Sequence, residues 1–219
     1  MKIRLYSGPL SMFGAKAHIA ALEKGLDVDL IMVPFNADDR YEPKHAEVVR
    51  INPKQQVPVL VHGDLELFDS TQIFEYLEEL SPQPALWPGD IKSRARARLL
   101  EHLSDEVYFP QVVQLMIYEE QPENPAFEAA LNAAAAYYQQ MEALIDGQDY
   151  LLGNYSFADI AFFMAQVFGE RKGALLTGAT PDLLAWRDRM TARPAVAEGV
   201  SALVSHLASK GRPVPEFLN

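Results

Sequence analysis

The chain contains no cysteine among its 219 residues. Disulfides, thiolate metal sites and a protein thiol nucleophile are therefore excluded together. Any sulfur chemistry that this protein carries out must use a thiol that belongs to a bound molecule.

The sequence also lacks a long hydrophobic run, although 49% of its residues are apolar. Charged residues interrupt the apolar ones, and no run reaches the roughly 18 residues that a transmembrane helix needs. The opening residues read as a strand and not as the basic, apolar and small-residue stages of a signal peptide. We expect a cytoplasmic protein that has no membrane partner.

Positive charge is scarce, because 19 lysines and arginines face 30 acidic residues and leave a net charge of −11. Affinity for nucleic acids rests largely on the release of counterions by clustered basic side chains. DNA and RNA are therefore not expected partners. The five histidines show no close pairing and no G-x-x-x-x-G-K loop is present, so we predict no metal site and no phosphate loop.

The first half of the chain alternates short apolar runs with helical patterns. Residues 2–6 and 28–33 read as strands, and residues 15–24 between them read as a helix that ends at a glycine. Such a βαβ unit pairs its strands in parallel. Two further apolar runs surround a glycine-containing turn within residues 57–68, which predicts an antiparallel hairpin.

A helix over residues 69–79 completes the order βαβ-loop-ββα, which is typical of a thioredoxin-like domain. The next ten residues hold three prolines and a glycine, as linkers do. Beyond them strand signals vanish, and Ser156 with Asp159 predicts a capping box at one helix start. The helical stretches run over residues 91–120, 125–145, 157–168, 181–192 and 196–209.

The predicted fold class is thus α/β plus all-α. A thioredoxin-like domain occupies residues 1–81, a linker occupies residues 82–90, and an all-helical domain occupies residues 91–219.

The peptide between Val57 and Pro58 opens a strand that must lie well inside the sheet, where a proline removes a ladder donor. This context predicts a cis peptide bond, although only about 5% of X-Pro bonds are cis. The backbone N–H and C=O of Val57 then face outward. They can pair with the backbone of a cysteinyl residue, as an added strand would.

Asp69 and Ser70 stand where a strand ends and a helix begins. The amide and hydroxyl of Ser70 lie at the positive end of the helix dipole, where a ligand carboxylate binds. Asp69 adds an acceptor for a cationic amine. Together the pair matches the head group of an α-amino acid, while the alternative is that Ser70 simply caps the helix.

Ser11 lies between the first strand and the first helix, at the sheet edge where α/β proteins bind ligands. Its expected role is to donate a hydrogen bond to a thiolate. Lowering a thiol pKa from about 8.5 by about two units represents about 2.7 kcal/mol, and one hydrogen bond to a charged acceptor contributes about 1.5 to 3 kcal/mol. Ser7 is the competing hydroxyl, and helix capping by both serines is the structural alternative.

These segments belong to a pattern that runs through nearly the whole chain. In the first half it comprises Leu5-Tyr6, Ser11, residues 16–20 (KAHIA), residues 52–60 (NPKQQVPVL) and Asp69-Ser70. In the second half it comprises residues 151–153, 156–161 (SFADIA) and 186–196 (WRDRMTARPAV). The pattern resembles the glutathione-transferase superfamily.

The resemblance implies that glutathione is the co-substrate. It implies that Ser11 is the catalytic hydroxyl. Val57 and Pro58 would bind the cysteinyl backbone, with Gln56 as a weaker contact. Asp69 and Ser70 would bind the γ-glutamyl group. It further implies a homodimer in which one subunit's sheet domain faces the other's helical domain. The implied activity is conjugation of glutathione to a small, apolar electrophile, as in detoxification.

The second substrate is expected between two groups of apolar side chains. One group holds Leu10, Met12 and Phe13, and the other holds Tyr108, Phe109, Met116 and Tyr118. Stripes at helical spacing are more often core than pocket, so only Phe13 and Tyr108 are predicted to contact the substrate.

Other functions remain open on the same fold. The chain also resembles the zeta class, which isomerises maleylacetoacetate, but Ser11-Met12-Phe13 replaces that class's Ser-Ser-Cys run. A glutathione-dependent isomerase, β-etherase or dehalogenase would use the same thiol site. A non-catalytic protein that serves protein interaction or filament organisation would not need that site.

Overall fold

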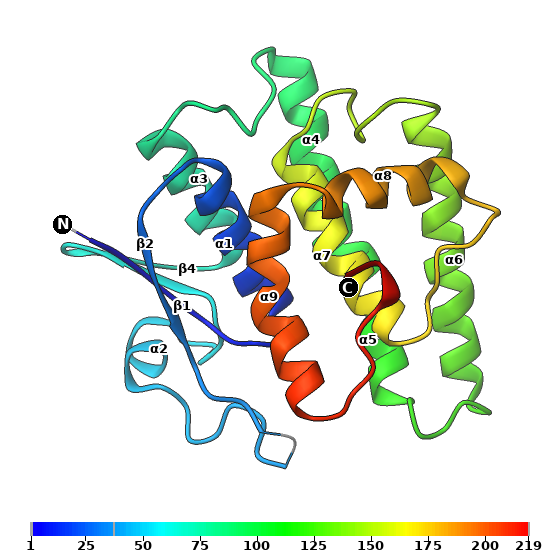
Figure 1. Ribbon diagram of the computed structural model, residues 1–219, viewed down its shortest axis with the longest axis horizontal. Coiled ribbons are helices and arrows are strands. Elements are labelled where there is room, and N and C mark those ends of the chain that lie inside the picture. The colour runs from blue at the N-terminus through cyan, green and yellow to red at the C-terminus, as the bar shows by residue number, and fades with distance from the viewer. Residues whose placement is uncertain (1, 37, 219) are drawn as a thin grey trace. The chain divides into compact units, whose positions relative to one another are not determined.

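The computed structural model of the protein describes residues 2–36 and 38–218 (Figure 1). The chain forms two compact units. The first comprises the residues up to Ala85 together with Pro194–Arg212, and the second comprises Leu86–Arg193 and the tail that begins at Pro213. Met1, Ala37 and Asn219, which the expected domains include, lie outside the described residues.

The first unit is built on a mixed sheet with the strand order β2-β1-β3-β4. Its strands are β1 (Ile3–Ser7), β2 (Val28–Met32), β3 (Val59–His62) and β4 (Leu65–Phe68). β1 and β2 are parallel, whereas β3 is antiparallel to both β1 and β4. The predicted βαβ unit and hairpin are confirmed.

Helices cover both faces of this sheet. On one face α1 (Met12–Glu23) and α3 (Ser70–Leu80) bury an apolar cluster that includes Leu5 and Leu60. On the other face α2 (Ala46–Ile51) contributes Val48 to a second cluster. The two clusters follow from the alternation of side chains along each strand.

The α2 helix is absent from the sequence prediction, which treated the segment between the second strand and the hairpin as a loop. Val48 is its only fully buried residue. A six-residue helix with one buried side chain has no apolar periodicity to detect. The correction matters because the start of α2 borders the cavity described below.

The helix α9 (Pro194–Ser209) belongs to the first unit, whereas the sequence analysis grouped its residues with the helical domain. It lies beside α1 (Figure 1). The approach is close, since a Cβ atom on Gly199 would lie 2.2 Å from Cγ1 of Ile19. The first unit is therefore completed by a segment from near the end of the chain.

The second unit is helical throughout. Its core is α7, in which every residue from Phe157 to Gly169 is buried. The capping box is confirmed, since the Ser156 amide donates to Asp159 over 2.9 Å, and Nε1 of Trp186 donates to the same carboxylate over 3.0 Å. The elements are α4 (Ile91–Leu103), the π-helix η1 (Ser104–Tyr108), α5 (Phe109–Ile117), α6 (Pro125–Ile145), α7 (Phe157–Arg171), α8 (Pro181–Thr191) and the 3-10 helix η2 (Glu216–Leu218).

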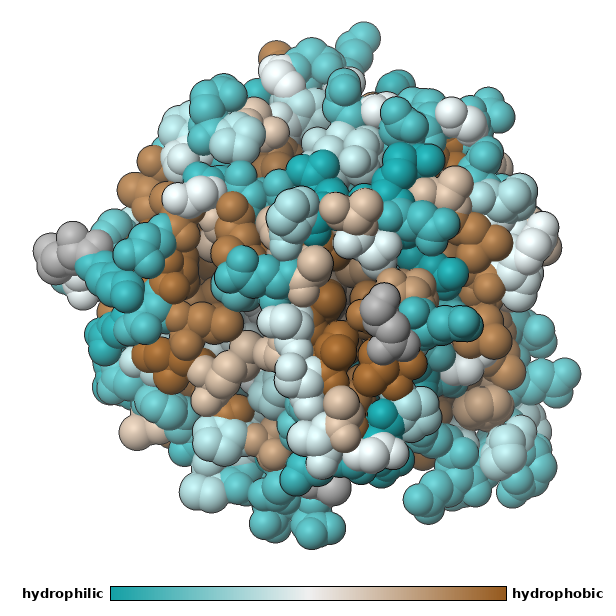
Figure 2. Space-filling model, viewed as in Figure 1, coloured by the Kyte–Doolittle hydropathy of each residue, from teal (hydrophilic) through white to brown (hydrophobic). Residues whose placement is uncertain are grey.

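The surface in view mixes apolar and polar side chains over both units (Figure 2). Within residues 2–36 and 38–218, none of the helices combines the length and the apolar character that crossing a membrane requires.

Candidate active site

A cavity of about 470 Å³ lies in the first unit, at the end of the sheet where β1 and β2 finish and β3 begins. It brings together four of the residues predicted from the sequence: Ser11, Phe13, Gln56 and Val57. The remaining lining residues are Val33, Asp39, Arg40, Tyr41, Glu42, Lys44, His45, Val48, Lys54 and Gln55.

Ser11 is the N-cap of α1, and its Oγ atom accepts a hydrogen bond from the Gly14 amide over 3.0 Å. The residue is half-buried and lines the cavity. Because Oγ acts as the acceptor in the cap, the hydroxyl keeps its own proton for donation. The site thus has an oriented donor at the positive end of a helix.

Ser7, the competing hydroxyl, is the last residue of β1 and is only 1% exposed. A Cβ atom on Gly14 would lie 2.0 Å from Ser7 Oγ and 3.0 Å from Ser11 Oγ. Ser7 is not among the cavity-lining residues. The geometry therefore favours Ser11 as the group that meets a ligand, and it requires glycine at position 14.

The peptide between Val57 and Pro58 is cis, as predicted. Val57 and Gln56 line the cavity, whereas Pro58 is buried and does not. The preceding loop is held by Asn52, whose side chain donates to the Gln56 carbonyl over 2.6 Å and accepts from the Lys54 amide over 2.9 Å. Asn52 is 4% exposed, so this anchor is internal.

Asp69 and Ser70 lie outside the cavity lining but close to Pro58 in the sheet. Phe68 pairs with Val59 across β3 and β4, so continuing the antiparallel register sets Asp69 opposite Pro58. Asp69 has a φ of 75° and caps α3 by accepting from the amides of the next residues, Thr71 over 3.1 Å and Gln72 over 3.3 Å. The cap is thus Asp69, and Ser70 is the first residue of the helix.

A cationic side of the cavity was missed by the sequence analysis. Arg40, Lys44 and Lys54 line it in a chain whose net charge is −11. Lys44 Nζ donates to Gln55 over 3.1 Å and lies 3.4 Å from the Glu42 carboxylate. Four lysine and arginine residues within the fifteen residues 40–54 of an acidic chain were the signal that could have revealed this anion-attracting wall.

His45 completes that wall. It is the N-cap of α2, and Nδ1 of its ring accepts from the Glu47 amide over 3.2 Å. The ring also packs against Tyr6, with 4.9 Å between ring centroids. Since Nδ1 is an acceptor, the proton of the neutral ring sits on Nε2.

The two residues predicted to contact the substrate lie in different environments. Phe13 is half-buried and lines the cavity. Tyr108 is only 1% exposed, and its hydroxyl is hydrogen-bonded to that of Tyr138, so it belongs to the aromatic core of the second unit with Phe162. Burial raises the pKa of Tyr108 well above its usual value. Such a side chain is not placed to receive a substrate.

The sequence matches two family models. The model described as glutathione S-transferase, N-terminal domain, covers residues 1–79, and the model of the C-terminal domain covers residues 97–194. The protein LigF of Sphingobium is 30% identical over 90% of this chain and 93% of its own. This chain belongs to the glutathione S-transferase family.

Other similar proteins differ in how much of the chain they match. A stringent starvation protein A homologue from Coxiella burnetii is 36% identical over 48% of this chain, which spans only 47% of that protein. A glutathione S-transferase from Rhodospirillum rubrum has a TM-score of 0.81 at 25% identity, covering 99% of this chain and 98% of that one. The solved LigF structure, described as a β-etherase, has a TM-score of 0.75 at 27% identity over 91% of this chain and 98% of its own.

The candidate chemistry of this site rests on hydroxyl, amide and cationic groups. Within the described part of the chain, no group of three or more histidine, aspartate or glutamate side chains is arranged to hold a metal ion.

Proposed function

We propose that this protein is a glutathione transferase that ionises the thiol of glutathione with the Ser11 hydroxyl and adds the thiolate to a small, apolar electrophile. The thioredoxin-like domain, residues 1–81, binds glutathione, and the helical domain, residues 91–219, shapes the pocket for the electrophile. One observation carries the proposal: Ser11 caps α1 through its acceptor lone pair while lining a cavity beside Val57.

Asp69 lies outside the cavity lining, whereas Arg40, Lys44 and Lys54 line the cavity, so the two parts of the proposed site differ in charge, as the ends of glutathione do. The γ-glutamyl group, which has both an ammonium and a carboxylate, suits Asp69 and the N-terminal residue Ser70 of α3. The cysteinyl backbone pairs with Val57, and Gln56 is a weaker contact. The glycyl carboxylate then faces the cationic wall that includes Lys44. This order directs the thiol toward Ser11.

The reaction requires the thiolate, because the thiol is a poor nucleophile. Donation from Ser11 stabilises the thiolate by about 1.5 to 3 kcal/mol, which corresponds to a pKa lowered by about one to two units. Bringing the electrophile to the bound thiolate supplies further acceleration through proximity. The thiolate then either displaces a leaving group or adds to an activated double bond.

The decisive experiment follows the absorbance of the glutathione thiolate against pH in the presence of saturating protein. We expect the pKa of the bound thiol to be about two units below its value in water, and Ser11→Ala to restore most of the difference. Ser11→Thr keeps both the cap and the donor and should retain a lowered pKa. Ser7→Ala is the matched serine control and should leave the pKa unchanged.

A second variant disturbs the Ser11 cap without removing its hydroxyl. Gly14→Ala introduces a Cβ atom 2.0 Å from Ser7 Oγ and 3.0 Å from Ser11 Oγ, so both serines should be displaced, and the Ser7→Ala control separates the contribution of Ser7. We expect the thiol pKa to rise in this variant as well. A lack of glutathione binding to the unaltered protein would contradict the transferase proposal and favour the non-catalytic alternative.

Ether cleavage is the second candidate, because LigF, which is 30% identical over 90% of this chain, is described in its solved structure as a β-etherase. In that reaction the thiolate would form a carbon–sulfur bond, and the ether oxygen would leave with the carbon–oxygen electron pair. Identifying the products from an aryl ether and from an activated halide distinguishes the two reactions.

We also propose that the protein is a homodimer. Its support in the second unit is a set of large apolar side chains left exposed on the segment from α4 to η1, namely Ile91 at 85%, Leu99 at 55% and Val107 at 46%. Apolar surface of this kind is typical of subunit interfaces. Sedimentation at several protein concentrations tests it, and a monomer at all of them would contradict the proposal.

A further inference from the structure

The cationic wall of the cavity lies beside the start of a short helix, α2. α2 comprises six residues and buries only Val48 fully. Isolated helices shorter than about 12 residues are marginal in water. The direction in which the start of α2 points must therefore be set by contacts to the rest of the first unit.

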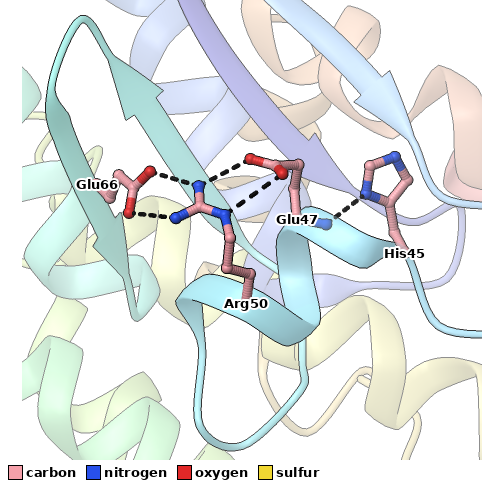
Figure 3. Close-up of polar contacts among 4 residues, drawn as sticks. All are labelled: His45, Glu47, Arg50 and Glu66. Carbon is pink, nitrogen blue, oxygen red and sulfur yellow. Dashed lines mark hydrogen bonds and ion pairs between the residues drawn. The ribbon is translucent and has the colours of Figure 1, made fainter.

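Arg50 supplies a polar contact of this kind (Figure 3). Its guanidinium group lies between two carboxylates, one from Glu47 on α2 itself and one from Glu66 on β4. Nη1 donates to Glu66 over 2.9 Å and Nη2 donates to Glu47 over 2.8 Å, and Nη2 makes a further short hydrogen bond to Glu66. A planar guanidinium can bridge two carboxylates in this way, whereas an ammonium group cannot reproduce the geometry.

All three charges persist at neutral pH. Hydrogen bonds from Arg50 hold the pKa of Glu47 and of Glu66 below the usual value. Arg4, on the neighbouring strand β1, adds a further positive charge that acts in the same direction on both glutamates. The bridge is therefore an ionised network and does not depend on a shared proton.

The ion-pair bridge formed by Glu47, Arg50 and Glu66 is connected at one end to the cavity lining. The backbone amide of Glu47, the residue that Arg50 contacts, donates to Nδ1 of His45 over 3.2 Å. His45 and its neighbour Lys44 line the cavity. Any rotation of α2 away from β4 would withdraw both side chains from the position that the glycyl carboxylate occupies in the proposed function.

At its other end the same bridge is connected, through β4, to Asp69 and Ser70. Glu66 precedes Asp69 by three residues, and β4 runs directly from one to the other. Arg50 therefore joins the strand that delivers Asp69 and Ser70 to the helix that presents Lys44 and His45. The Arg50 side chain therefore links the two parts of the site, in addition to the packing of Val48 and Ile51 on the sheet.

We propose that Arg50 is a positioning residue, which clamps α2 to β4 and thereby sets the affinity of the site for the glycyl end of glutathione. The inference rests on the proposed function, since it assumes that glutathione occupies the cavity. Exposed ion pairs contribute little to global stability. Loss of the clamp should accordingly alter ligand affinity far more than it alters the stability of the protein.

The test compares two ligands on each variant by calorimetry: glutathione and γ-glutamylcysteine, which lacks the glycine. We expect Arg50→Met to weaken glutathione about fivefold to tenfold and to change γ-glutamylcysteine by less than about twofold. Arg50→Lys should be intermediate, because a single ammonium group cannot bridge both carboxylates. Exchanging the charges in the double variant Arg50→Glu, Glu66→Arg should recover part of the loss.

The matched control is Arg189→Met, which removes an arginine that contacts Asp149 in the second unit. It should leave both affinities unchanged. Hydrogen exchange gives a readout without ligand, and amides of residues 46–51 should exchange faster in Arg50→Met than in the unaltered protein.

Equal weakening of the two ligands, or unchanged glutathione affinity in Arg50→Met, would overturn the positioning role while leaving the transferase proposal intact. Failure of the unaltered protein to bind either ligand would overturn both.

Discussion

Two residues combine helix capping with a place in the cavity lining. Ser11 caps α1 and His45 caps α2, and in each case the side chain accepts a backbone amide while it borders the cavity. Accepting the amide fixes the rotamer, so the remaining donor, a hydroxyl or Nε2–H, points in a defined direction before a ligand arrives. Capping therefore preorganises these donors, which is a main source of catalytic stabilisation.

His18 on α1 gives the first unit a pH-dependent stability. Burial lowers its pKa below the usual 6.5, and the nearby carboxylate of Glu198 on α9 opposes that shift only in part. The unfolded chain thus binds a proton more readily than the folded one. The free energy of unfolding should decrease as the pH falls through about 6.5, and be fully retained above it.

Replacing this group isolates the effect. The pH dependence of unfolding by urea, measured from about pH 7.5 to about pH 5.5, should be flatter in His18→Gln than in the unaltered protein, by up to about 1.4 kcal/mol per pH unit. His102→Gln, at an exposed position in the second unit, is the control and should keep the original slope. Parallel curves for all three proteins would show that His18 does not titrate differently on folding.

The residues that could be predicted from the sequence are those tied to a local backbone event. Ser11 follows a strand and precedes a helix, and Val57 precedes a proline at a strand start, so each could be placed without a fold. Lys44 and His45 precede a helix with no apolar periodicity, and that helix contacts Glu66 through Arg50, sixteen residues earlier in the chain. Their place in the site depends on tertiary contacts.

Tyr108 was expected to contact the substrate but is buried, and the sequence could not show this for a related reason. An aromatic residue at helical spacing looks the same in sequence whether it faces a pocket or a core. The five-residue π-helix that ends at Tyr108 changes the phase of the segment, and the side chain is buried beside Tyr137 and Phe162. No sequence pattern signals such a change of phase.

The helices and strands that were predicted closely have a strong apolar periodicity, or a proline or glycine at their ends. α6 was predicted at residues 125–145 and runs from Pro125 to Ile145, because proline opens it and a glycine follows it. The strands agree with the prediction to within about two residues at each end. α2 was missed, and the grouping of α9 with α1 is a tertiary feature that helix prediction does not address.

One buried lysine joins three elements at the edge of the first unit. Lys24 follows α1, and its side chain is 0% exposed. Nζ donates to the carbonyls of Ser81 over 2.6 Å and Pro84 over 2.9 Å, and it pairs with the Glu78 carboxylate of α3 over 2.6 Å. Backbone carbonyls at a helix end lack an intrahelical donor. Lys24 supplies that donor to the end of α3 and to the segment that follows it.

Lys24→Met removes the charge and keeps the length of the side chain. Because it removes the Lys24 ammonium group from a nearly buried carboxylate and two carbonyls, we expect it to lower the free energy of unfolding by about 3 to 5 kcal/mol. Unfolding by urea provides the measurement. Lys210→Met, at an exposed position of the same unit, should stay within about 0.5 kcal/mol of the unaltered protein. Equal effects of the two substitutions would mean that the Lys24 contacts do not stabilise the fold.

On the scale of the whole molecule, neither compact unit is a single continuous segment of the chain. The first unit contains the candidate site and begins the chain, yet α9, which packs on α1, follows residues 86–193 of the helical unit in sequence. α1 carries Ser11 at its start. The environment of the proposed catalytic hydroxyl is therefore complete only when residues 194–209 have folded back onto the first unit.

This arrangement makes Gly199 a sensitive position for the first unit alone. In Gly199→Leu the new Cβ atom would lie 2.2 Å from Cγ1 of Ile19, so α9 must move away from α1. Overpacking of this kind costs about 1 to 3 kcal/mol. Hydrogen exchange should accelerate in α1 and α9, and glutathione binding should weaken, while α7 in the second unit serves as the internal reference and stays protected.

Gly178→Leu is the matched control, since a Cβ atom at that position would meet nothing within 4 Å. It should change neither exchange nor binding. If Gly199→Leu accelerated exchange in α7 as much as in α1, the two units would unfold as one and α9 would stabilise the whole chain. If exchange in α1 did not change, α9 would be dispensable to the helix that carries Ser11, and the proposed site would be complete without the end of the chain.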